Sequence, residues 1–578
     1  MVSKLKRVGL ALLVLFLVGC GESDNTVSTF ITEEEGSGNI NLVDHVGNNE
    51  TLKYTHNLGN TPQDVYFIFT NPTSSDINAD TVVSSNFEIE KKDGTTPSNK
   101  VKDQILSGDS GALSADGFTI GLRDRPEILQ IEGLPIPFNQ SLAEMSGSVF
   151  PETPNLVAVG STHDFLDWNF NSNTEVTVSA TLRKIIDVSA DIVLNLWVED
   201  SSWAPCSKSK CMNATMLAAF GEKFLMAGPN NDIYDWITGI FGAPWGSHTN
   251  PAYIGEAYKN QIDILFYDID EDNSTNGGVL GFFWSKDNAI RNTSDTTYFT
   301  NISNQRLMFY IDAVMAATEE SSSWAITDEW PSEIVATLAH EFQHMIHFYQ
   351  KTLIRAEGAS QTWLNEMCSM AAEDFVADKI LVNGPRGVTF DTYGAGSSGN
   401  SEGRLPWFND VNYLGLTDWL QGNNVYYSYA TSYAFGAYLA RNYGGALLFK
   451  AIVQNDFTDS EAVTQALSDL GVTISFSDLL RKWGAAVLLS DRTDSPTDFR
   501  YNTGNSFTSD SGSVTYNVGS INLFNYSPEP VIIESSEFTL TSQYKTANRY
   551  FKVGSNLTGS YSWYIGMPQN VRLTIVTK

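Results

Sequence analysis

The sequence predicts a multidomain α+β protein. Its 578 residues exceed the size at which a single hydrophobic core usually stops growing, so more than one domain is expected. Hydrophobic residues make up 42% and aromatic residues 12%, which is enough apolar material for packed cores. Strand-like runs near both ends of the chain enclose a centre with strong helical patterns. We therefore expect β modules on both sides of a mixed β and helical domain.

Residues 1–19 have the pattern of a bacterial lipoprotein signal peptide. Basic residues precede an apolar run at 8–18, which is too short to span a bilayer. The following Leu-Val-Gly-Cys tetrad resembles a lipobox, which implies lipidation of Cys20, and Gly21 in place of an aspartate favours the outer membrane. We expect an outer-membrane lipoprotein, periplasmic or surface-exposed. The alternative is an ordinary signal peptide followed by a chance cysteine.

The charge balance argues against one class of partner. The chain carries 35 Lys and Arg against 67 Asp and Glu, a formal net charge of −32. Such a surface repels phosphate backbones, so nucleic acid is not an expected partner. Lipid membrane, reached through the acyl anchor, is the expected contact. Residues 20–38 are polar and rich in Glu, Ser and Gly, and are predicted to be a flexible tether.

The remaining chain divides by its pattern into three parts. Residues 39–150 show short β runs broken by turn residues, which predicts a β-sandwich-like module, either stable or removed as a propeptide. Residues 151–499 begin with strands, become helical near residue 331, and contain an irregular Gly-, Asn- and Ser-rich segment at 383–422 that is typical of a site-lining loop. Residues 500–578 return to strands and predict a small C-terminal β module.

The sequence His-Glu-Phe-Gln-His at 340–344 carries the chemistry. On a helix, His340 and His344 lie one turn apart on one face, where both imidazoles can reach one cation. Zinc favours such nitrogen ligands and keeps a position for water in catalytic sites. Glu341 is correctly placed to take a proton from that water. A structural histidine pair on an amphipathic helix is the alternative.

A downstream motif strengthens the zinc hypothesis. In "WLNEMCSMAAE", Asn365, Glu366 and Ser369 match the "NExxS"-like motif of the gluzincin clan, and the two motifs together resemble the hyicolysin-type family of zinc endopeptidases over roughly residues 190–490. The resemblance implies one catalytic zinc ion held by His340, His344 and Glu366. It also implies that Asn365 belongs to the surroundings that orient the ligands.

Two positions depart from thermolysin-like enzymes of this clan. An acidic residue four positions after the third ligand is replaced by Met370, so Glu373 is the candidate for orienting a histidine, with a structural helix charge as the alternative. No histidine follows His347, so a tyrosine is expected to stabilise the oxyanion. We choose Tyr429, by resemblance to the tyrosine-bearing helix of aminopeptidase-N-like enzymes, with Tyr433 second.

Other candidate residues receive simpler interpretations. His347 cannot complete a metzincin site, and we expect pocket lining or packing. Cys206 and Cys211 could close a short disulfide in an oxidising compartment, and Cys368 is expected to be a buried, inert thiol. Alternating Asp268, Asp270 and Asp272 suggest a calcium loop, but Asn273 replaces the required glycine, so calcium is possible but unsupported and a solvated turn is favoured.

These features predict a zinc endopeptidase that hydrolyses proteins or peptides outside the cytoplasm. No "GxMEN"-like exopeptidase motif occurs between residues 306 and 331, and the segment 305–315 is expected to be an edge strand that pairs with extended substrate. The first alternative is a non-catalytic, lipid-anchored surface binding protein or adhesin with a peptidase-like lobe. The second is an enzyme that acts on non-peptide bonds.

Overall fold

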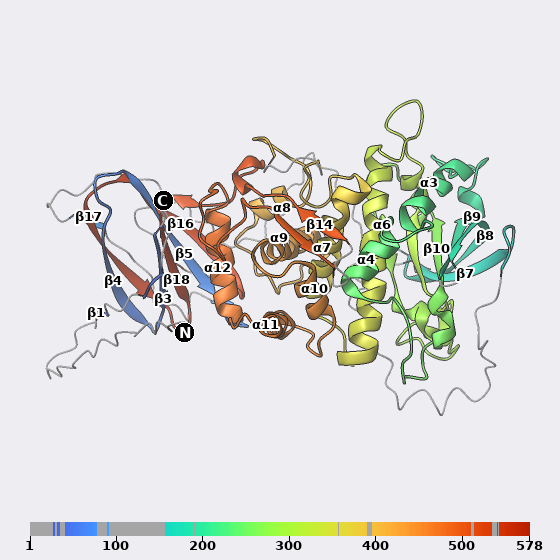
Figure 1. Ribbon diagram of the computed structural model, residues 1–578, viewed down its shortest axis with the longest axis horizontal. Coiled ribbons are helices and arrows are strands. Elements are labelled where there is room, and N and C mark those ends of the chain that lie inside the picture. Colours follow the sequence, from blue (N-terminus) through green and yellow to red (C-terminus); the bar gives the residue numbers. More distant parts are fainter. Residues whose placement is uncertain are drawn as a thin grey trace, which may run out of the picture.

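The structure is a computed structural model in which three parts follow one another along the long axis (Figure 1). It describes residues 41–77, 157–169, 172–189, 192–356, 358–389, 396–509, 514–534, 540 and 543–578, with short strands at 27–28, 32–34 and 89–91. A β-sandwich at one end is followed by a helical part and then by a sheet covered with helices. The expected α+β, multidomain class is confirmed. The expected signal peptide and Cys20 lie outside the described residues.

The β-sandwich is built from both ends of the chain. Its larger sheet has the order β15-β16-β5-β18-β3-β2, and its smaller sheet the order β1-β4-β17-β6. The strands are β1 (Val27–Ser28), β2 (Thr32–Glu34), β3 (Asn41–Val46), β4 (Glu50–Asn57), β5 (Gln63–Asn71), β6 (Ile89–Lys91), β15 (Ile533–Glu534), β16 (Ala547–Leu557), β17 (Ser560–Met567) and β18 (Arg572–Thr577).

This arrangement differs from the two separate β modules expected at 39–150 and 500–578. Strand β5 lies between β16 and β18, and β17 pairs with β4, so described strands of both ranges share both sheets. The strands of both ranges bury their apolar side chains in one core. In this core, Leu52 and Phe67 from the first range lie with Trp563 from the second. Each set contributes strands to both sheets, and the core between the sheets is complete only when both sets are present.

The far part is a six-stranded sheet with the order β11-β12-β10-β9-β8-β7. Its strands are β7 (Thr162–Asn169), β8 (Thr174–Ser189), β9 (Ile192–Glu199), β10 (Gln261–Tyr267), β11 (Gly281–Phe283) and β12 (Met308–Asp312). Strands β9, β10 and β12 are parallel, and β11 is antiparallel to β12. Helices α3 (Ala214–Phe224), α4 (Ile233–Phe241) and α5 (Ala313–Ala316) belong to this part.

The expectation of an edge strand at 305–315 is wrong. Strand β12 lies between β10 and β11, and all five of its residues are buried, as is typical of an inner parallel strand. The chain after β10 returns through a turn-rich segment and adds β11 outside β12. Among the described strands, β11 is therefore one edge of this sheet and β7 is the other.

The middle part is helical and supplies the long helices of the site. They are α6 (Glu329–His347), continued by the π-helical η6 (Phe348–Ala356), α7 (Thr362–Ile380), α8 (Leu405–Asp410), α9 (Val425–Asn442), α10 (Ala446–Val453), α11 (Ser460–Asp469) and α12 (Phe476–Leu488), with the hairpin β13 (Asn505–Thr508) and β14 (Thr515–Val518). Short 3₁₀ turns are η1 (Asp200–Ser202), η2 (Glu256–Asn260), η3 (Ile269–Glu271), η4 (Ser285–Asn288), η5 (Thr300–Ile302), η7 (Gly422–Asn424) and η8 (Leu523–Asn525).

Helix α6 lies between the sheet and the other long helices (Figure 1). It begins at Glu329, two residues before the expected start near residue 331, and Glu329 and Pro331 lie in its first turn, where an acidic side chain and a missing N–H fit the helix start. It packs against β11 and β12 on one side and α7 on the other, and α7 packs against α9. One continuous cluster of buried apolar side chains joins these elements, so the sheet and the helices share a core.

No helix in the described part of the chain is both long and apolar enough to span a bilayer.

The sandwich is joined to the helical part through α12. Asn548 on β16 donates to the Leu480 carbonyl at 3.0 Å, and Arg572 on β18 forms an ion pair with Asp478 at 2.5 Å.

Candidate metal centre

Helices α6 and α7 bring together three side chains that could hold a metal. One ligand atom each of His340, His344 and Glu366 lies within 4.8 Å of the others, and all three side chains are buried. His340 Nε2 is 3.2 Å from Glu366 Oε2, and His344 Nε2 is 3.7 Å from Glu366 Oε1. The two helices run antiparallel here, so the early part of α7 faces the late part of α6.

The other nitrogen of each imidazole is also held from α7. His340 Nδ1 lies 2.7 Å from Glu373 Oε1, and His344 Nδ1 lies 3.2 Å from Asn365 Oδ1. In the tautomer that donates Nδ1–H to these oxygens, both Nε2 lone pairs face Glu366. This is the arrangement in which histidine binds a metal, with the partner oxygen fixing ring orientation.

Glu341 also belongs to this buried group and is 0% exposed. Together with Glu366 and Glu373 it places three carboxylates in the protein interior, beside two imidazoles. Buried negative charge is costly unless a cation or hydrogen bonds offset it. A divalent cation among the three converging ligand atoms fits both the donor set and this charge.

A pair of polar side chains behind His344 was not among the candidate site residues. Ser369 Oγ donates to Gln343 Oε1 at 2.5 Å and lies 3.1 Å from His344 Nδ1. Ser369 was noted only as part of the "NExxS"-like pattern. The signal available in the sequence was its spacing of one helical turn from Asn365, which places both side chains on one face of α7.

The two candidate tyrosines differ in their surroundings. The Tyr429 hydroxyl lies 3.5 Å from Glu366 Oε1, next to the three converging ligands. Tyr433 is one turn further along α9, and burial, followed by the negative charge of Asp374, raises the pKa of its phenol well above the usual range. The geometry therefore favours Tyr429 over Tyr433 as a residue of this site.

The other candidate residues do not join this group. His347 Nε2 and Ser360 Oγ share a hydrogen bond of 2.8 Å. Burial lowers the pKa of the His347 imidazole well below the usual range. Cys206 and Cys211 form a disulfide with Cα atoms 5.9 Å apart. Burial raises the pKa of the Cys368 thiol to about 12, which makes it inert.

The aspartates after β10 give no support to a calcium site. Asp268 forms an ion pair with Lys208 at 2.5 Å and accepts the backbone N–H of Asn273 at 2.9 Å. Within the described part of the chain, Asp268, Asp270 and Asp272 do not converge as a metal-binding group. The favoured interpretation of this segment as a turn agrees with its 3₁₀ turn η3.

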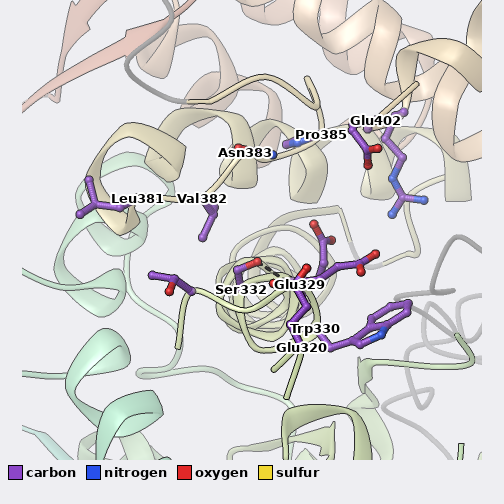
Figure 2. A pocket seen from close by; sticks show the side chains of 13 residues that line it. Glu320, Glu329, Trp330, Ser332, Leu381, Val382, Asn383, Pro385 and Glu402 are labelled. Atoms are coloured by element: carbon purple, nitrogen blue, oxygen red, sulfur yellow. Dashed lines mark hydrogen bonds between the residues drawn. The ribbon is translucent and has the colours of Figure 1, made fainter. Parts of the chain in front are cut away.

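A cavity of about 450 Å³ lies at the N-terminal end of α6, between Glu329 and Trp330 on one side and Pro385 and Glu402 on the other (Figure 2). The residues that line it include the buried Arg404, from the segment before α8. Partial burial, and then the charges of neighbouring glutamates, raise the pKa of Glu329. The Gly-, Asn- and Ser-rich segment expected to line a binding site thus contributes to this cavity.

Two imidazoles one turn apart on a buried helix, a carboxylate beside the first, and a glutamate ligand on an antiparallel helix define the class of gluzincin-like metallopeptidases. The chain belongs to the Peptidase M30 family, whose family model matches residues 174–578. It is also similar to the neutral metalloprotease ShpI of Staphylococcus hyicus, with 28% identity over 217 residues. That match covers 36% of this chain and 42% of the length of the relative.

A likeness to one solved structure is weaker. It is a mutant M1 zinc metallopeptidase from Deinococcus radiodurans, bound to a Tyr-Ser-Ala substrate. The match has 11% sequence identity and a TM-score of 0.24, and covers 59% of this chain and 60% of the other. We draw no conclusion from it.

Proposed function

We propose that this chain is a zinc-dependent endopeptidase that hydrolyses proteins or peptides outside the cytoplasm. The observation that carries the proposal is the convergence of His340, His344 and Glu366 at one buried point, with the buried Glu341 next to His340 in the sequence. Two nitrogens and one carboxylate oxygen suit zinc and leave a fourth position for water. When bound, zinc would lower the pKa of its water and polarise the peptide carbonyl.

The residues of the chain would then share the proton and charge movements. Glu341 takes a proton from the attacking water as the C–O bond forms, and passes it to the amine nitrogen as the C–N bond breaks. The Tyr429 hydroxyl, 3.5 Å from Glu366, is placed to donate to the carbonyl oxygen as negative charge develops there. Glu373 and Asn365 keep the two imidazoles oriented.

Strand β11 is our candidate for pairing with extended substrate because it is an edge of the sheet, although its three side-chain positions are buried. It runs beside α6: a Cβ on Gly281 would lie 2.8 Å from Thr337 Cγ2, and Thr337 precedes His340 by three residues. Backbone pairing with this edge would bring a peptide bond close to the proposed zinc site without requiring a particular side chain. This supports endopeptidase activity on unfolded or extended segments.

An extracytoplasmic, lipid-anchored location completes the proposal. Cys206 and Cys211 form a disulfide, and such bonds persist in oxidising compartments. The lipobox-like tetrad ending at Cys20 would supply an acyl anchor to the outer membrane. Metabolic labelling with a palmitate analogue, compared between the native chain and Cys20→Ala, tests the anchor, and loss of label in the variant is the expected result.

The catalytic proposal is tested with Glu341→Gln, which preserves shape and removes the base. Zinc content should stay at one ion per chain while casein cleavage falls by about 10²- to 10⁴-fold. Glu461→Gln, the same change at an exposed position of α11, is the matched control and should keep full activity. Zinc binding without Glu341-dependent proteolysis would support a surface binding protein or a non-peptide substrate instead.

A further inference from the structure

Arg404 lies against the tyrosine that the proposed function assigns to the carbonyl oxygen. The centre of its guanidinium is 5.2 Å from the centroid of the Tyr429 ring, and the side chain is 4% exposed. Trp419 contacts the same ring edge-on, with centroids 5.0 Å apart and planes at 73°. The hydroxyl of Tyr429 lies 3.5 Å from Glu366 Oε1. The ring is thus held by a cation and an indole while its hydroxyl is directed at the proposed metal ligand.

Two glycines bring the backbone of Arg404 to this position. The Arg404 N–H donates to the Pro385 carbonyl at 2.8 Å. Gly387 and Gly403 have φ values of +65° and +79°, and a Cβ on Gly387 would lie 2.1 Å from the Glu402 carbonyl oxygen. Only glycine fits such a conformation and such a close approach. The segments after α7 and before α8 therefore pack backbone against backbone, which anchors Arg404 next to α9.

We propose that Arg404 is a positioning residue that holds the Tyr429 hydroxyl in line with the carbonyl oxygen of the substrate. This inference rests on the proposed role of Tyr429. A guanidinium on the face of an aromatic ring is attracted by the negative charge of that face, and the attraction is stronger where water is excluded. Trp419 contacts the same ring, so the two contacts together restrict its rotation.

The loss of this contact should affect one stage of the reaction. A donor to the carbonyl oxygen matters most when negative charge develops there, in the transition state. If Tyr429 becomes free to rotate, substrate binding is kept and the chemical step becomes slower. Variants of Arg404 should therefore lower kcat and leave KM nearly unchanged.

The experiment compares Arg404→Gln and Arg404→Lys with a matched control, Arg386→Gln. Arg386 is also 4% exposed and also follows α7, but its guanidinium donates to the Ser520 carbonyl at 3.1 Å. We expect kcat on a fluorogenic peptide to fall about tenfold in Arg404→Gln with KM changed by less than about twofold. Arg404→Lys keeps a cation beside the ring and should lose only about threefold. Arg386→Gln should keep kcat even where its thermal midpoint falls.

A double-mutant cycle shows whether the effect passes through Tyr429. In a Tyr429→Phe background, Arg404→Gln should cause no further fall in kcat, because the hydroxyl that it positions is absent. Tyr433→Phe serves as the background control, since Tyr433 is equally buried and lies one turn away on α9. There, Arg404→Gln should keep its tenfold effect. Zinc content and thermal midpoint are measured for every variant.

Each outcome supports or overturns the inference. An equal fall in kcat with and without the Tyr429 hydroxyl would overturn it and indicate direct contact of Arg404 with substrate in the cavity that it lines. Unchanged kcat in Arg404→Gln would also overturn it. If Arg404→Gln does not fold, the same cycle is run with Arg404→Lys. If Tyr429→Phe keeps full kcat, the proposed role of Tyr429 fails first, which distinguishes the two failures.

Discussion

Replacing Glu373 by glutamine removes a buried charge without removing the hydrogen bond acceptor. The carboxylate is 0% exposed and lies 2.7 Å from His340 Nδ1, so the bond between them is short and shielded from water. A hydrogen bond to a charged group is worth about 1.5–3 kcal/mol, roughly 10- to 150-fold in an equilibrium constant. A glutamine oxygen can still accept from Nδ1–H, so we expect about a tenfold loss of zinc affinity.

Glu373→Ala should be more damaging, because it leaves the buried imidazole donor with no acceptor. We expect a loss of about 100-fold in zinc affinity, the upper end of what partners of metal-bound histidines contribute. Affinity is measured by competition with a chromogenic chelator on the purified chain. Thermal unfolding with and without zinc gives a second reading, since a ligand that binds only the folded state raises its stability.

Asp374→Asn is the matched control for this experiment. Asp374 is the next residue of α7 and is 5% exposed, but it forms an ion pair with Arg441 at 3.2 Å. Its replacement should lower stability while zinc affinity remains unchanged. Glu373 variants that bind zinc as tightly as the native chain would refute the reasoning, and so would an equal loss of affinity in Asp374→Asn.

Two further predictions concern stability. Phe67→Ala, in the middle of β5 and 0% exposed, should cost about 3–5 kcal/mol in the free energy of unfolding of the sandwich, measured by denaturant titration; a change below about 1 kcal/mol would contradict the central place of β5. Burial lowers the pKa of Lys351 to about 8, from the ordinary lysine value of 10.5. The unfolded chain therefore binds more protons between these pH values, and stability should rise with pH across that window. Relative to Lys351→Met, the gain is roughly 3 kcal/mol between pH 8 and 10.5, and an unchanged difference across the window would disprove it.

The shared sandwich bears on whether the N-terminal region could be removed as a propeptide. Strand β5 pairs with β16 on one side and with β18 on the other. Loss of the chain before residue 77 would expose both strand edges and the core around Trp563. We therefore expect residues 41–77 to remain part of the mature protein, which N-terminal sequencing and intact mass of the purified chain would show.

Local features of the chain were predictable because their causes lie within a few residues. The spacing of His340 and His344 places both on one helical face, and Pro331 indicated the start of α6 to within two residues. The family motif pointed to Glu366, and the helix that carries it is present as α7. Glu373 was predicted as a histidine partner because it follows Glu366 by two helical turns and so lies on nearly the same face of α7. The structure places it beside His340.

Contacts between distant segments could be decided only by packing. The continuous apolar run in β5 and the alternation of apolar residues in β18 predict strands but do not say that they pair with each other, since either could have bonded to nearer neighbours. The apolar run 308–311 reads equally well as an edge or an inner strand until β11 is placed beside it. Arg404 belongs to no recognisable sequence motif. Its contact with Tyr429 depends on the close approach of the backbone at Gly387 to the backbone at Gly403. The helices and the metal-binding residue types could be predicted from the sequence because helix periodicity is local. The strand partners and the surroundings of the site could not, because burying apolar surface depends on the whole chain.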